Sequence, residues 1–223
     1  YAGHEIFHLF TPMIEKGHWG IEFNSGFQTG FPDHGDDAER ADVRAAHEVD
    51  IHTDVTDFWM AKLALDFERE AGDDYAFTAI ASENVFRLDK WTPRFFDAAW
   101  FTALSAAIDS EATNSVEFGP VLSLTSGSTA LVLNPFFEKT FGQNREDGIA
   151  FTYAWRATYT FNEHLSIGIE GYGEVENIGN APPADEQVHR VGPVLYLGPM
   201  HGAPNHPASQ HAHGTGVEDQ ASA

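Results

Sequence analysis

Regular alternation of apolar and polar residues is the strongest pattern in this chain of 223 residues. Over residues 151–161 every second side chain is aromatic or small and apolar, while most positions between them are Thr, Ala or Arg. A period of two sustained over such a length is typical of a β-strand with two different faces. A short connection at 162–164 leads to a second alternating segment, 165–174. Two such segments joined by so few residues predict a β-hairpin.

The same period recurs along most of the chain and predicts ten strands. Because several neighbouring segments are joined by only a few residues, we expect strands that follow each other in sequence to pair in antiparallel fashion. The pattern therefore predicts an all-β fold, an antiparallel up-and-down β-barrel. The predicted strands cover residues 19–28, 48–55, 59–68, 75–86, 96–109, 115–124, 129–141, 151–161, 165–174 and 187–197.

The connections between these strands predict where the barrel resides. Short connections at 56–57, 125–128 and 162–164 alternate with longer, acidic ones at 32–46, 69–74, 109–114, 142–148 and 176–187. Barrels of the bacterial outer membrane have short periplasmic turns, longer external loops and spanning strands of roughly 9 to 11 residues. No segment approaches the roughly 18 consecutive apolar residues that a membrane-spanning helix needs. The sequence therefore predicts a transmembrane barrel in the outer membrane of a Gram-negative bacterium.

Two features disturb the strand pattern. Pro120, Pro135 and Pro193 lie inside predicted strands, although proline cannot donate a hydrogen bond to the sheet. In the segment 75–86, alternation is broken at Glu83 and Asn84, where we expect a β-bulge. A soluble barrel or sandwich is the alternative fold, and it would require the alternating aromatic residues to be buried in the core.

Charge and cysteine content narrow the possible functions. The chain has 34 acidic and 12 basic residues and a formal net charge of -22, so nucleic acid is not an expected partner. It contains no cysteine, which excludes disulfides and thiolate metal sites. Phosphate-binding loops, nucleophile elbows and the spacing of a Ser-His-Asp triad are not found, so we expect no enzymatic activity.

The strand faces predicted to point inward collect most of the charged residues. They indicate either a lumen that favours cations or a narrow barrel in which opposite charges pair and fill the interior. The predicted lumen-facing residues are Glu22, Asp50, His52, Asp54, Lys62, Asp66, Glu117, Glu138, Arg156, Glu170, Glu174 and Arg190.

Histidine and carboxylate groups raise the question of a metal. Asp50, His52 and Asp54 share one face of a strand, but positions two apart are about 6.5 Å from each other, which favours solvated lumen residues over a chelating site. The C-terminal segment 199–223 is rich in Pro, Gly and Ser and is predicted to be flexible. We expect no required cofactor, and at most a weakly bound divalent metal at the tail residues His201, His206, His211 and His213, which are otherwise incidental.

Several segments resemble a known family, the bacterial outer-membrane proteins of the MetA pathway of phenol degradation. The similar segments are Thr56–Leu63, Val116–Pro120, Leu133–Gly142, Tyr153–Ala157, Gly168–Glu174 and His189–Leu195. The resemblance implies a barrel scaffold without an active site. It also implies a further hairpin after residue 197, so the barrel either closes with ten strands or, as we favour, has about twelve with an incomplete C-terminus here.

These observations predict three regions: an N-terminal lead-in over 1–16, either periplasmic or occluding the lumen, a barrel over 17–198 and a flexible His-rich tail over 199–223. The predicted function is that of a narrow, porin-like channel or conduit for small solutes with an acidic lumen. The alternative is a plugged structural or accessory barrel that docks a partner protein or a metal through its loops and tail. Outer-membrane lipid and lipopolysaccharide are the expected surroundings.

Overall fold

A computed structural model describes residues 8–29, 43–69, 74–88, 95–108, 113–143, 145–183 and 187–197. These residues form ten strands and one short 3-10 helix, Ile178–Asn180. None of their helices is long and apolar enough to cross a membrane. The strands are β1 (Trp19–Thr29), β2 (Val43–Thr56), β3 (Trp59–Arg69), β4 (Ala76–Arg87), β5 (Phe96–Ala107), β6 (Asn114–Ser126), β7 (Thr129–Phe141), β8 (Ala150–Asn162), β9 (Leu165–Val175) and β10 (Val188–Leu197).

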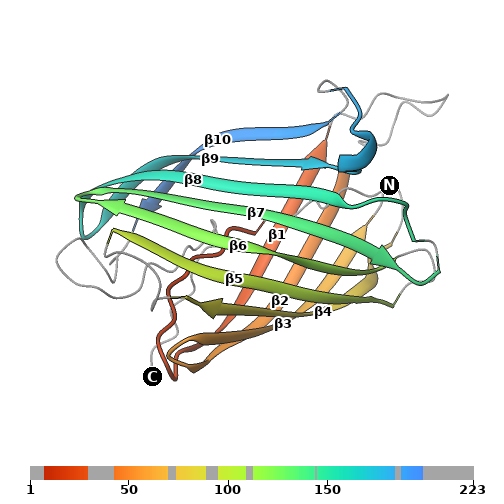
Figure 1. Cartoon of the computed structure of the whole chain (residues 1–223), viewed down its shortest axis with the longest axis horizontal. Coiled ribbons are helices and arrows are strands. Elements are labelled where there is room, and N and C mark those ends of the chain that lie inside the picture. The colour runs from red at the N-terminus through yellow and green to blue at the C-terminus, as the bar shows by residue number, and fades with distance from the viewer. Residues whose placement is uncertain are drawn as a thin grey trace.

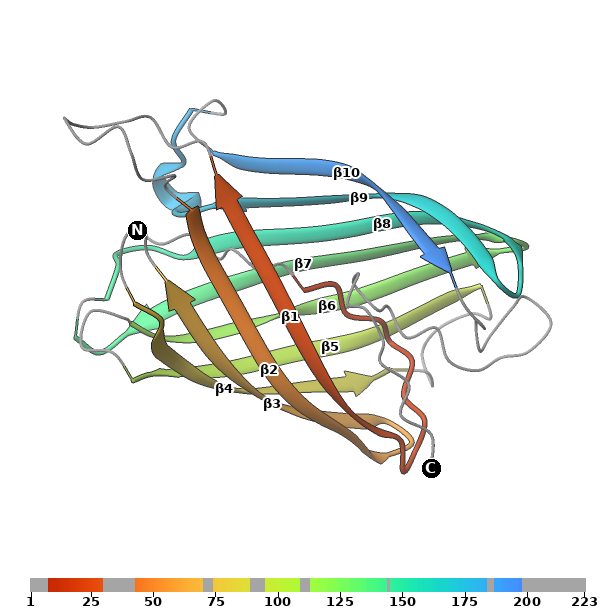
Figure 2. The ribbon, with the colours of Figure 1, turned by 180° about the vertical axis from the view of Figure 1, so that it is seen from behind.

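All ten strands belong to one sheet, in which each strand pairs in antiparallel fashion with the next one in sequence. This confirms the predicted all-β, up-and-down topology. The two edges of the sheet are β1 and β10. The sheet curls round on itself and brings these edges toward each other at one end (Figures 1 and 2). Figure 2 shows the Thr29 end of β1 near the start of β10, while the opposite ends of these strands diverge. Within the described residues, the two edges are not hydrogen-bonded to each other.

The distribution of side chains is the reverse of that in a soluble protein. Large apolar residues on the outer face are exposed, with Trp19 at 67%, Phe23 at 61% and Val191 at 72%. Charged and polar residues point into the space that the sheet encloses. An extensive apolar exterior of this kind is compatible with an outer-membrane barrel. The soluble alternative does not fit, because the aromatic residues on the outer strand faces are not in a core.

The prolines occupy positions where the sheet tolerates a missing donor. Pro120 and Pro135 face each other in a gap of the β6–β7 ladder, between the pairs Phe118–Phe137 and Leu122–Leu133. Both prolines therefore interrupt the same few positions. Pro193 lies in the edge strand β10, where a missing donor costs little.

The predicted bulge lies elsewhere in β4. Its register shifts near Thr78, because Asp66 pairs with Ala79 while Phe67 pairs with Phe77. At Glu83 the alternation continues, with Glu83 buried and Asn84 accepting a hydrogen bond from Trp59 Nε1 at 3.0 Å. The polar residue on the outer face, Asn84, is thus explained by its hydrogen bond to Trp59. The register is regular at Glu83 and Asn84, so the prediction of a bulge at these two residues was wrong.

The connections at one rim are short, but not all of them. Two residues join β2 to β3, β6 to β7 and β8 to β9. The three connections predicted to be short are short, and the β4–β5 connection, 88–95, which lies at the same rim, is longer.

Gly119 lies in the gap of the β6–β7 ladder, where the two strands leave no room for a side chain. A Cβ atom added at Gly119 would collide with the carbonyl oxygen of Pro135, whereas nothing lies within 4 Å of a Cβ added at Gly192 in β10. We therefore expect Gly119→Ala to cost about 1 to 3 kcal/mol of unfolding free energy through overpacking. Urea unfolding in detergent micelles measures the effect, with Gly192→Ala as the control. Equal midpoints for the two variants would contradict this account of the gap.

Candidate functional site

The interior of the curled sheet contains a dense set of buried charges. Lys62 and Arg156 are the buried cations among the described residues. Burying so many ionised groups is costly unless they pair with one another. The buried carboxylates belong to Glu48, Asp50, Asp54, Glu83, Glu138 and Glu174.

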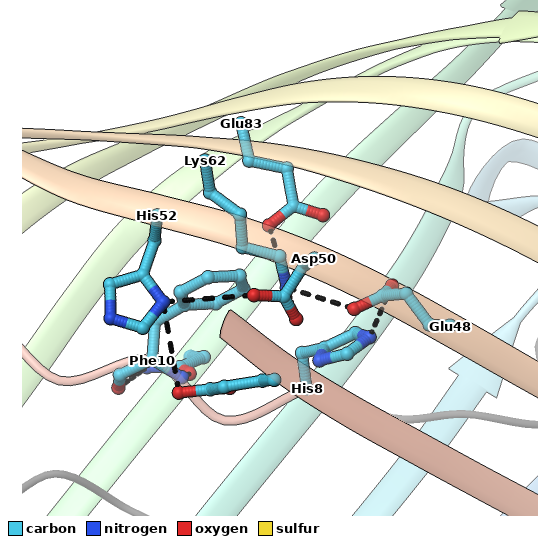
Figure 3. A network of polar contacts seen from close by, with 9 residues as sticks. His8, Phe10, Glu48, Asp50, His52, Lys62 and Glu83 are labelled. Atoms are coloured by element: carbon cyan, nitrogen blue, oxygen red, sulfur yellow. Dashed lines mark hydrogen bonds and ion pairs between the residues drawn. The ribbon is translucent and has the colours of Figure 1, made fainter. Parts of the chain in front are cut away.

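Lys62 on β3 is the centre of the largest cluster (Figure 3). Its Nζ atom lies 3.0 Å from Glu48 Oε1, 3.3 Å from Asp50 Oδ2 and 3.3 Å from Glu83 Oε2. Sheet pairing places them together, because Lys62 pairs with Glu83 of β4 and with His52 of β2, beside Asp50. One ammonium group thus contacts carboxylates from both neighbouring strands.

Two histidines extend this cluster in opposite directions. His8 Nε2 lies 2.9 Å from Glu48 Oε2. His52 Nδ1 lies 3.6 Å from Asp50 Oδ1 and 3.8 Å from Glu22 Oε1 on β1. The result is a continuous chain of charged groups along the inner wall.

A second cluster joins β8, β9 and β10. Arg156 Nη1 lies 3.4 Å from Glu170 Oε1 and donates a hydrogen bond to Tyr196. The Tyr196 hydroxyl donates to Glu170 Oε1 at 2.7 Å, and Tyr172 donates to Glu170 Oε2 at 2.6 Å. Each oxygen of Glu170 therefore has a partner.

Residues 8–18, which are called the lead-in from here on, run through the space enclosed by the sheet (Figures 1 and 2). Phe10 N donates to Asn134 Oδ1 at 2.6 Å, and Asn134 Nδ2 donates to Phe10 O at 3.1 Å. The amide of Asn134 thus pairs with the lead-in as a neighbouring strand would. Near β1, Glu15 N donates to Asp54 Oδ2 at 2.7 Å, which anchors the other end.

An apolar contact completes the hold on this segment. The Phe10 ring lies 4.5 Å from the ring of Phe101 on β5, and Phe101 lies 4.5 Å from Phe136 on β7, measured between centroids. Ile14 belongs to the same buried cluster as Val85. A small hydrophobic core therefore forms inside the sheet, and the lead-in supplies part of it.

Two cavities flank the lead-in. One, of about 140 Å³, is lined by His8, Phe10 and Phe136 and by the predicted lumen residues Asp66, Glu117 and Glu138. The other, of about 150 Å³, is lined by Met13 together with Glu22, His52, Asp54, Arg156 and Glu170. His8 and Phe10 of the lead-in line both cavities, and each cavity has polar as well as apolar walls.

The structure brings most of the predicted lumen residues into these two regions. Glu117 accepts a hydrogen bond from Thr152 at 2.9 Å, and Glu174 is buried on β9. Arg190 lies on β10 opposite Tyr172 and is exposed at the sheet edge. The tail histidines His201, His206, His211 and His213 lie outside the described residues.

Sequence reasoning missed three contributors to this site. Glu83 was assigned to a bulge, Asn134 is a single polar residue among apolar neighbours, and Phe10 lies outside any alternating segment. For Asn134 a signal existed, because its position in the alternation of β7 is inward. No pattern in the sequence indicated where Phe10 would lie.

The Lys62 cluster predicts a large effect of removing its cation. Lys62→Met would leave Glu48, Asp50 and Glu83 buried without their common counter-ion, and we expect a loss of about 3 to 5 kcal/mol of unfolding free energy. Lys139→Met is the control, since that ammonium donates to the backbone oxygens of Glu146 and Gly148 rather than to a group of buried carboxylates. Chemical unfolding in detergent compares the two, and a Lys62→Met protein as stable as the control variant would overturn the prediction.

Comparison with known proteins gives one match. The family described as "Putative MetA-pathway of phenol degradation" matches residues 90–201. Searches of curated proteins and of solved structures found no match. The matched range includes β5 to β10, which carry Asn134, Arg156 and Glu170. By this match, which spans half of the sequence, the chain belongs to the family of the MetA pathway of phenol degradation.

Proposed function

We propose that the protein is a bacterial outer-membrane β-barrel that acts as a narrow conduit for small solutes, with residues 8–18 as an internal plug. The exposed apolar exterior supports a membrane location, with lipid and lipopolysaccharide as its surroundings. Strands of 10 to 14 residues are long enough to span an outer membrane when tilted. No enzymatic activity and no nucleic-acid partner are part of the proposal.

The observation that carries this proposal is how the lead-in is held. Its polar contacts with the wall include those to Glu48, Asn134 and Asp54, and it lines two cavities. Because residues 8–18 form no strand of the sheet, they can shift without unfolding the sheet around them. When the lead-in shifts, the two cavities would join into a path in which carboxylates outnumber the cations Lys62 and Arg156, which favours the passage of cations.

The solute class follows from the lining and from the family. One cavity combines Phe10, Phe101 and Phe136 with carboxylates. The description of the family names phenol degradation. Small aromatic compounds are therefore the organic solutes that we propose alongside small cations.

One observation favours the alternative, a plugged structural barrel. Phe101, Val85 and Val121 are almost completely buried in the cluster that Ile14 joins, so the lead-in is also part of a hydrophobic core. In that case the lead-in would stabilise the barrel permanently, and the loops would bind a partner protein. Conductance separates the two functions, because a permanently plugged barrel passes no steady current.

Loosening the plug tests the proposal. Asn134→Ala removes both hydrogen bonds to Phe10, and we expect a several-fold higher single-channel conductance in planar bilayers, with cation selectivity read from the reversal potential in a salt gradient. Thr160→Ala, which removes a hydrogen bond to Ser166 away from the lead-in, is the control and should conduct like the parent. Absence of current in all three proteins would favour the structural barrel.

The His8 contact predicts a dependence on pH. Burial and the nearby Lys62 ammonium lower the pKa of His8, but the charge and hydrogen bond of Glu48, together with the charge of Glu83, outweigh them and raise the pKa above its usual value. A raised pKa means that protonated His8 holds the plug below the ordinary histidine pKa, and that this hold is lost as pH rises through the raised value. We therefore expect conductance to increase with pH across this range.

His8→Gln is the matched variant for this measurement. It keeps a hydrogen-bonding side chain but cannot carry a charge, so the rise in conductance with pH should disappear while any titration of the wall carboxylates persists. If the two proteins show the same pH profile, His8 does not control the plug.

A further inference from the structure

Three potential metal ligands converge on the inner wall between β1 and β2. One donor atom each from Glu22, Asp50 and His52 lies within 4.8 Å of the others. The imidazole Nδ1 of His52 is 3.6 Å from Asp50 Oδ1 and 3.8 Å from Glu22 Oε1. Bonds of about 2.0 to 2.2 Å to a tetrahedral metal ion place ligand atoms roughly 3.4 Å apart, so a small inward movement would bring these atoms to bonding positions.

Asp50 supplies an independent indication of a missing ligand. Its side chain is 0% exposed, yet neither carboxylate oxygen accepts a hydrogen bond from the described residues. Oδ2 faces the Lys62 ammonium at 3.3 Å, which leaves Oδ1 directed toward His52. A buried carboxylate normally accepts hydrogen bonds, and a bound cation would compensate for their absence at Asp50 Oδ1.

The ring of His52 is held in the orientation that this site requires. Gly20 is its partner across the β1–β2 ladder, and a Cβ atom at Gly20 would come within 2.6 Å of His52 Cε1. The absence of a side chain there lets the imidazole lie flat against β1. The ring of His18 stacks on the imidazole of His52, with centroids 5.7 Å apart and planes at 24°. The ring is thus oriented by both neighbours, with Nδ1 directed at the two carboxylates.

The charges around Lys62 also call for an additional cation. Glu48, Asp50 and Glu83 surround Lys62, and Glu22 lies beside His52, so these four carboxylates exceed the one permanent cation by three negative charges. Protonated His8 can compensate Glu48. A divalent ion between Glu22 and Asp50 would compensate the rest.

We propose that Glu22, Asp50 and His52 form a binding site for a divalent first-row transition-metal ion such as Zn²⁺. One imidazole and two carboxylates suit such an ion, whereas Ca²⁺ and Mg²⁺ prefer oxygen ligands alone. The cavity of about 150 Å³ in front of Glu22 and His52 gives access and room for water as a fourth ligand. Lys62 would hold Asp50 in position from behind. The site does not depend on whether the barrel conducts.

Titration with Zn²⁺ tests the site in the full chain. Because the tail histidines would also bind metal, the parent for this experiment carries Asn at positions 201, 206, 211 and 213. The protein, folded in detergent without an affinity tag and stripped with EDTA, is titrated by calorimetry. We expect one equivalent of Zn²⁺ per chain, and a tetrahedral Co²⁺ absorption spectrum when Co²⁺ replaces it.

Substitution of single ligands then separates this site from others. Glu22→Gln and His52→Gln should each weaken Zn²⁺ binding by at least 10-fold to 100-fold. His189→Gln, in which the imidazole that contacts Tyr153 on the outer face is replaced, is the control and should bind as the parent does. Heat-modifiable migration on a gel verifies folding, and Glu22, which is partly exposed, is the variant least prone to misfold. No binding by the parent, or unchanged affinity in both ligand variants, would overturn the proposal.

Discussion

Pairing of the buried charges is the constraint on which the rest of this structure depends. The outer face is apolar, so the charged residues of the strands lie inside, where an unpaired charge is expensive. Lys62 resolves the largest conflict because three strands bring its ammonium within 3.3 Å of three carboxylates. That solution fixes the register of β2, β3 and β4, since slipping one strand by a single residue would turn its charged residues outward.

The lead-in supplies partners for polar groups of the strands that point into the interior. Glu48 makes one contact with Lys62 and a second with His8, and both ends of the buried Asn134 amide form hydrogen bonds with the backbone of Phe10. The polar side chains of the wall therefore bind the lead-in through its backbone at Phe10 and through the His8 side chain. The aromatic contact of Phe10 with Phe101 adds the apolar part. The interior therefore combines ion pairs, hydrogen bonds and apolar contacts, and the lead-in takes part in all three.

Strand positions could be read from the sequence, but the contacts between distant segments could not. Alternation with period two located all ten strands, because one face must be apolar and the other polar along every strand. It also placed Asp50, His52 and Lys62 on the inner face. It could not show that Glu22 rather than Asp54 approaches His52, since that depends on the β1–β2 register and on the space left at Gly20. Phe10 belongs to no repeating pattern, so its place could come only from the structure.

The same reasoning explains why Asp54 and Asp50 have different roles although they share a strand face. Asp54 lies near the end of β2, where its side chain accepts from Glu15 N and its backbone bonds to Gly17 and His18. Asp50 lies four residues further along β2, where its carboxylate faces the Lys62 ammonium and the His52 imidazole. The position of each carboxylate along β2 therefore determines its partner, which is the lead-in backbone for Asp54 and the Lys62 ammonium for Asp50. A carboxylate near the rim can hold the entering chain, whereas one at the centre can be satisfied only by a cation.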